Sequence, residues 1–87
     1  MNDNHYYLKT MQTLLTAKIK TPFKVHHLAC NGPNNQCITH LQQLGFLPGE
    51  EIVVHRRALF ALGPLVVRLG ASTFALRHSE ATCIFVA

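Results

Sequence analysis

The feature that most constrains the fold is the segment of residues 44–57, because it joins the end of a helix to a strand within a few residues. Gly45 stands where a helix needs a left-handed closing residue. Pro48 and Gly49 occupy the two central positions of a type II turn. The β-branched residues 52–54 then favour a strand that ends at two arginines. The sequence therefore predicts a helix, a tight turn and a strand in immediate succession.

The segment before this corner is expected to be a helix of about ten residues, capped by Asn34 or Asn35. Apolar side chains recur there at i, i+1, i+4 and i+7, so they share one face: Cys37, Ile38, Leu41 and Leu44. Because so short a helix is marginal alone in water, we expect it to pack on a sheet.

Apolar–polar alternation between turn signals predicts the other strands. They are expected at residues 23–28, 64–69, 73–77 and 82–86, with a hairpin at 70–72 and a single helical turn at 79–81. The fold class is thus mainly β. We predict a small SH3-like antiparallel barrel of about five strands, with one short helix in the first long connection and a helical turn before the last strand.

Residues 1–20 are expected to form an N-terminal extension, and residues 21–87 the SH3-like domain. Five apolar residues of the extension recur at roughly helical spacing: Leu8, Met11, Leu14, Leu15 and Ile19. Since chain termini are commonly held poorly, we expect this segment to be partly helical or flexible and to pack loosely.

The formal net charge is +4, from eight Lys and Arg against four acids. Only 14% of the residues are charged and 48% are hydrophobic, which favours an apolar contact patch on the surface. The locally basic first half suits an anionic partner. No apolar run approaches the roughly 20 residues of a membrane-spanning helix, and we identify no secretory signal.

The chain has three cysteines at irregular spacings. An odd number without a regular pattern argues against a disulfide framework and for a reducing compartment. The cytoplasm is therefore the expected location.

The order and spacing of short motifs across residues 20–86 resemble the ferrous-iron transport protein A (FeoA) family. The motifs are residues 41–49 (LQQLGFLPG), 52–54 (IVV), 56–58 (RRA), 63–65 (GPL), Gly70, 74–77 (FALR), 79–81 (SEA) and 84–86 (IFV). A similar pattern occurs in the C-terminal domain of metal-dependent repressors, but no DNA-reading helix pair precedes the barrel here.

This resemblance implies a small cytosolic accessory protein of ferrous-iron uptake. Its partner would be FeoB, the membrane ferrous-iron transporter with a GTPase domain, which it would bind and modulate from the inner face of the membrane. The resemblance implies no cofactor and no small-molecule substrate.

The candidate contact surface is an apolar loop beside guanidinium donors, which is the anatomy of a binding anchor. Its residues are Arg56, Arg57, Leu59, Phe60 and Leu62. The competing interpretation is that these side chains fold back and cap the open end of the barrel.

Cys30, Cys37 and His40 are the residues from which a transition-metal site would be built. The six residues between the cysteines do not fit a zinc knuckle, and Cys37 is predicted to face the core. The sequence therefore predicts no native metal site. It also holds no paired carboxylates, phosphate-binding glycine loop or nucleophile motif, so we expect no catalytic residues and no enzyme activity.

Two other functions compete with transporter binding. A basic SH3-like barrel could bind nucleic acid, which we do not expect because basic and aromatic residues do not alternate along one strand. The other is a transition-metal-binding sensor domain. Self-association through a free strand edge is left open by the sequence.

Overall fold

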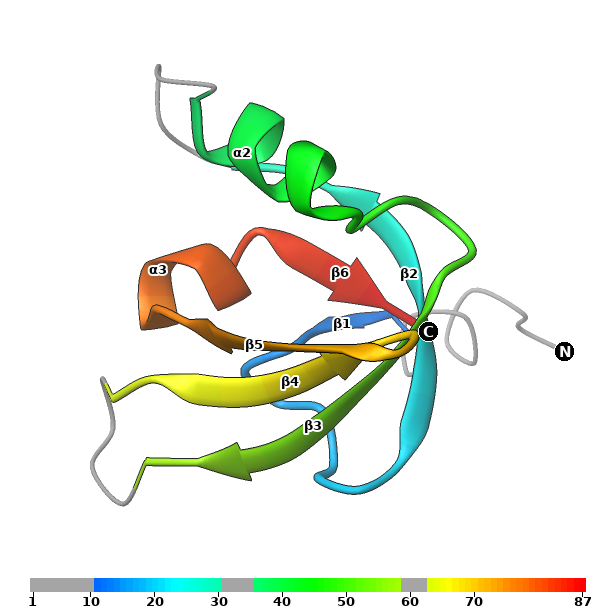
Figure 1. Ribbon diagram of the computed structural model, residues 1–87, viewed down its shortest axis with the longest axis vertical. Coiled ribbons are helices and arrows are strands. Elements are labelled where there is room, and N and C mark those ends of the chain that lie inside the picture. Colours follow the sequence, from blue (N-terminus) through cyan, green and yellow to red (C-terminus); the bar gives the residue numbers. More distant parts are fainter. Residues whose placement is uncertain (1–10, 31–35, 59–62) are drawn as a thin grey trace, which may run out of the picture.

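The computed structural model describes residues 11–30, 36–58 and 63–87, which form six strands and two short helices (Figure 1). The strands are β1 (Gln12–Thr13), β2 (Pro22–Leu28), β3 (Glu51–Arg57), β4 (Leu65–Leu69), β5 (Ser72–Leu76) and β6 (Ile84–Val86). The helices are α2 (Gln36–Leu44) and α3 (His78–Ala81). All strand pairs are antiparallel, in the order β1-β6-β2-β3-β4-β5. The predicted mainly β, SH3-like architecture is confirmed, with β1 as an additional strand.

Helix α2 ends as the sequence predicts. Gly45 has a φ of +109°, and its N–H donates to the carbonyl of Gln42 at 3.0 Å. The N–H of Phe46 donates to the carbonyl of Leu41, also at 3.0 Å. These two bonds form a Schellman motif, whose characteristic apolar contact joins residues in the positions of Leu41 and Phe46. Both side chains are fully buried, so the end of the helix is anchored in the core.

The turn after α2 is also the predicted one. Gly49 has a φ of +94°, and the N–H of Glu50 donates to the carbonyl of Leu47 at 3.1 Å, as in a type II turn. Two further hydrogen bonds attach this turn to Val25 of β2. The N–H of Gly49 donates to the carbonyl of Val25 at 2.8 Å, and the N–H of Val25 donates to the carbonyl of Glu50 at 2.9 Å. The turn therefore fixes where β3 enters the sheet.

The core lies inside the curled sheet and beneath α2, which covers β2 and β6 in Figure 1. Phe46 is the largest fully buried side chain, and its ring centroid lies 5.4 Å from that of Phe74. The other fully buried large side chains come from all along the described chain: Leu14, Leu41, Ile52, Leu76, Ile84, Val54, Val67 and Val86. Three of the four residues of the expected apolar face of α2 pack inward, with Leu41 buried and Cys37 and Leu44 half-buried against the core. The fourth, Ile38, is half-buried but is not among the side chains that pack against the core.

The expectation of a loosely packed or helical segment before residue 21 is wrong for residues 11–20. Residues Gln12–Thr13 form β1 and pair with β6, and a series of turns follows. Leu14 and Ala17 are fully buried. Burial of these two side chains adds apolar area to a small core, so the segment is part of the barrel. Residues 1–10 lie outside the described residues.

Candidate functional site

Two of the predicted contact residues, Arg56 and Arg57, lie at the end of β3, whereas Leu59, Phe60 and Leu62 lie outside the described residues. The β3–β4 register shifts between Val54 and Arg56. Strand alternation from the buried Val54 would turn Arg56 inward and Arg57 outward, but a bulge inserts one residue and reverses this. Arg56 is accordingly exposed and Arg57 is half-buried.

The guanidinium of Arg57 is occupied within the fold. Its Nη2 donates to the carbonyl of Leu14 at 2.9 Å and also to the carbonyl of Ala17. Its Nε is buried and has no hydrogen-bond partner within the described part of the chain. Arg57 therefore fastens the N-terminal segment to β3, a role that the sequence did not suggest.

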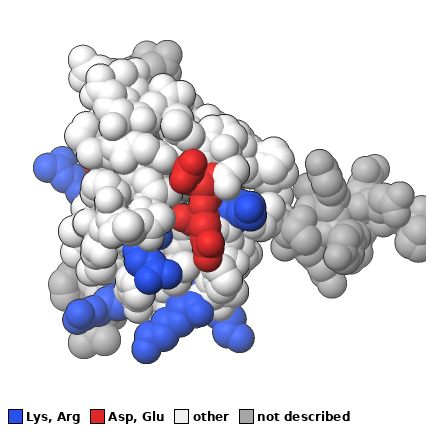
Figure 2. All heavy atoms as spheres, turned by 45° about the vertical axis from the view of Figure 1, so that its right-hand side comes forward, with Lys and Arg blue, Asp and Glu red and all other residues white. Residues whose placement is uncertain are grey.

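Arg56 instead lines a shallow hollow that we call the basic hollow. Its lining residues are Ile19, Lys20, His55, Arg56 and Val66. Ile19 is one of two large apolar side chains that are clearly exposed in the described residues, at 42%. In Figure 2 most of the visible Lys and Arg side chains lie on the lower part of the face, while one lies at the left edge and one beside the acidic side chains. An exposed apolar group beside fixed positive charges suits contact with an acidic protein surface.

The structure brings all three cysteines together. Cys30 follows β2 and Cys83 precedes β6, at the same end of an antiparallel ladder in which Leu28 is the partner of Ile84. Cys30 and Cys83 form a disulfide, with Cα atoms 5.1 Å apart. The sequence-based argument against a disulfide is therefore wrong, because it used cysteine number and spacing and ignored the pairing of the two strands.

The third sulfur belongs to Cys37, in the first turn of α2. Its Sγ lies 3.8 Å from that of Cys83, and the three sulfurs all lie within 4.8 Å of one another. His40, the other ligand suggested by the sequence, is exposed and is not in this group. The residue that sequence reasoning missed is Cys83, which could have been found by pairing the first and last predicted strands.

Burial raises the pKa of the Cys37 thiol, and the negative charge of Glu80 raises it further. Because only the thiolate is alkylated, we expect iodoacetamide to modify Cys37 more slowly than free cysteine near neutral pH. Cys37 is the one thiol outside the disulfide, so a pH–rate profile of the oxidised chain reports on it alone. The midpoint should lie above that of free cysteine, and a lower midpoint would contradict the assigned environment.

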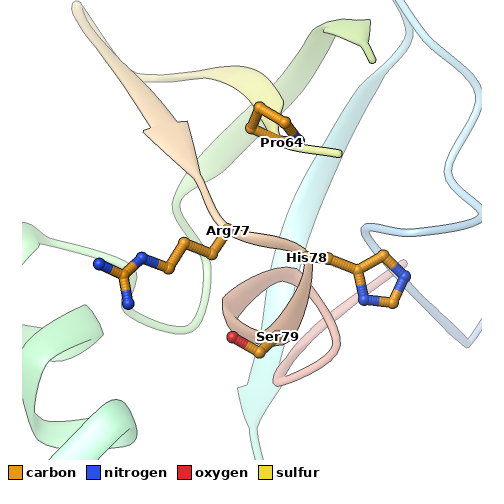
Figure 3. A pocket seen from close by; sticks show the side chains of 4 residues that line it. All are labelled: Pro64, Arg77, His78 and Ser79. Carbon is orange, nitrogen blue, oxygen red and sulfur yellow. The ribbon is translucent and has the colours of Figure 1, made fainter. Parts of the chain in front are cut away.

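A second hollow lies between the start of β4 and α3, lined by Pro64, Arg77, His78 and Ser79 (Figure 3). The side chains of Arg77 and His78 point in opposite directions from the backbone. General acid–base or nucleophilic chemistry needs groups that converge on one reacting atom. The arrangement of these four side chains does not provide such a constellation.

No helix in residues 11–30, 36–58 and 63–87 has the length and apolar character to cross a membrane.

Comparison with known proteins gives a family and a fold. Residues 12–87 match the model of the FeoA domain. FeoA of Stenotrophomonas maltophilia, solved in complex with zinc, is 32% identical with a TM-score of 0.78, and the match covers 87% of this chain and 89% of that one. A FeoA-like protein of Clostridium acetobutylicum is 27% identical with a TM-score of 0.75, covering 90% and 86%. No curated protein matches the chain.

A manganese-dependent transcriptional repressor is also similar in structure. It is 19% identical with a TM-score of 0.76, and the match covers 88% of this chain and 41% of that one. At this level of identity the likeness shows a common fold and says nothing about function.

Proposed function

We propose, since this chain belongs to the FeoA family, that it is a cytosolic accessory protein of ferrous-iron uptake that binds a FeoB-type transporter and changes its activity. The observation that carries the proposal is the family match over residues 12–87. The S. maltophilia relative is described as an SH3 domain protein and a candidate activating factor of ferrous-iron transport. We extend that role to this chain.

The basic hollow is the surface that we assign to the partner. It combines the exposed Ile19 with Lys20 and Arg56, and it lies at the end of β3 that leads into residues 59–62. Charges around an apolar centre steer association and fix the orientation of the partner, while burial of the apolar group in the interface contributes favourable binding free energy. Arg57 contributes indirectly, because it holds the segment that carries Ile19 against β3.

The mechanism would be a population shift without catalysis by this chain. A partner can change a two-state equilibrium only by binding one state more tightly than the other. We therefore expect the affinity for the transporter to depend on its nucleotide state. Arg56 is the exposed guanidinium in the basic hollow, and no residue of this chain is assigned a catalytic role.

We expect Arg56→Gln to weaken binding to the transporter's cytosolic GTPase domain roughly tenfold, the effect of losing an interfacial arginine worth about 1.4 kcal/mol. Arg68→Gln is the matched control, because Arg68 is exposed on the neighbouring strand β4 but lies outside the basic hollow. Both variants have the same composition and the same net charge. Isothermal titration calorimetry at physiological salt measures the two affinities.

Equal weakening by Arg56→Gln and Arg68→Gln would assign binding to net charge and refute the basic hollow as the contact. Absence of any association between the unmodified chain and the transporter in every nucleotide state would refute the proposed function itself.

A further inference from the structure

The cluster of Cys30, Cys37 and Cys83 has no part in the proposed partner contact, and it is the densest group of soft ligands in the described residues. We propose that the reduced chain binds a thiolate-preferring cation, with Zn²⁺ as the probe, through these three sulfurs. The disulfide between Cys30 and Cys83 switches this site off. The proposal is independent of the proposed function, since it needs no transporter.

The three sulfurs are held by separate elements that pack together. The N–H of Ala29 donates to the carbonyl of Cys83 at 3.0 Å, which fixes the backbone beside Cys30 against that of Cys83. The N–H of Cys83 donates in turn to the carbonyl of Glu80 at 3.1 Å. Cys37 is held by α2, whose Leu41 is fully buried. Because these backbone positions do not depend on the disulfide alone, reduction should leave the three thiols close together.

The distances suit a metal. With Zn–S bonds of about 2.3 Å, two sulfurs at neighbouring corners of a tetrahedron lie about 3.8 Å apart. The Sγ atoms of Cys37 and Cys83 already have a separation of 3.8 Å, and no pair in the cluster exceeds 4.8 Å. Once the disulfide is reduced, small rotations of the Cys30 and Cys83 side chains would complete three corners.

The surroundings leave room for an ion to enter. Cys83 is 6% exposed, whereas Cys30 and Cys37 are half-buried, so the cluster lies at the edge of the core. Three protein ligands leave the fourth tetrahedral corner to water or an added ligand. Thiolates favour Zn²⁺ and other soft ions over the hard ions that carboxylates bind.

The switch is a balanced two-electron reaction. The thiols of Cys30 and Cys83 give up two protons and two electrons and form one S–S bond, while a disulfide oxidant such as oxidised glutathione becomes two thiols. The oxidised chain retains a single thiol, Cys37, which is too few to hold the ion. In a reducing compartment the disulfide would be open and the site available.

The test is a Zn²⁺ titration of the whole chain against a chromophoric chelator, after anaerobic reduction and again after oxidation by oxidised glutathione. We expect one ion per reduced chain with sub-micromolar affinity, and roughly 100-fold weaker binding after oxidation because the site loses two of its thiolates. Cd²⁺ in place of Zn²⁺ should give the ultraviolet charge-transfer absorption of thiolate ligation. No binding to the reduced chain, or equal binding to the oxidised chain, would overturn the proposal.

The variants locate the ion. Cys37→Ser should weaken Zn²⁺ binding by roughly 100-fold, because it removes one of the three thiolate ligands and leaves Cys30 and Cys83 unchanged. His40→Ala is the control, because His40 lies on the next turn of α2 and is exposed. It should bind like the unmodified chain. Cys37→Ala repeats the test, and thermal unfolding verifies that each variant is folded. Equal affinity in Cys37→Ser and the unmodified chain, or equal loss in His40→Ala, would refute the site.

Discussion

Phe46→Ala should lower the free energy of unfolding by about 3–5 kcal/mol, the usual loss for a buried Phe truncated to Ala. Phe46 is the largest fully buried side chain, and it packs beside Phe74. It also occupies the position in the Schellman motif that anchors the end of α2. Truncation would leave a cavity and loosen the helix end together. Urea denaturation followed by circular dichroism measures the loss.

Leu47→Ala is the matched control, because Leu47 is the next residue but is 45% exposed. Because an exposed side chain buries little apolar surface on folding, its truncation should lower the free energy of unfolding by less than about 1 kcal/mol. Similar losses in the two variants would mean that Phe46 does not anchor the end of α2 in the core.

The corner between α2 and β3 could be predicted because its determinants are local. Gly45 and Gly49 both adopt positive φ, and a glycine at each of these positions is the residue that such a conformation favours. The strands were predictable for a related reason, since alternation of buried and exposed side chains along β4 is visible in the sequence. Neither inference requires knowledge of which segments meet.

What the sequence did not reveal depends on contacts between distant segments. β1 is two residues long and is defined by pairing with β6 at the other end of the chain, so it has no pattern of its own. The disulfide is similar, because Cys30 and Cys83 are separated by 53 residues and become neighbours only when β2 pairs with β6. Counting cysteines and their spacings carries no information about such pairing.

The candidate contact residues show the same division. The basic end of β3 and the apolar residues after it were recognisable from residue types alone, but the different roles of Arg56 and Arg57 were not. The bulge in the β3–β4 ladder decides which of the two faces inward. A shift of one residue in register exchanges the two faces of a strand, and no residue pattern in β3 indicates this shift.

Arg57→Met should lower the free energy of unfolding by about 2–4 kcal/mol. Each of the two hydrogen bonds from this charged donor contributes about 1.5–3 kcal/mol to stability. This loss is partly offset, because the variant no longer buries the unpartnered Nε, whose desolvation costs about 1–3 kcal/mol. The variant keeps an apolar side chain and leaves the carbonyls of Leu14 and Ala17 without their donor. Denaturant unfolding measures the global loss, and amide hydrogen exchange measures local opening. The N–H of Leu14, which donates to the carbonyl of Ile84 at 3.1 Å, should exchange faster.

Arg56→Met separates this effect from a general loss of charge on β3. Arg56 is exposed, and substitutions at such surface positions usually change stability by less than about 0.5 kcal/mol. A loss in Arg56→Met equal to that in Arg57→Met would contradict the assignment, as would unchanged exchange at Leu14. The expected difference between the two variants follows from the bulge, because the bulge turns Arg57 inward and leaves Arg56 on the exposed side of the strand. Arg57 then holds the N-terminal segment in place, while the side chain of Arg56 is exposed.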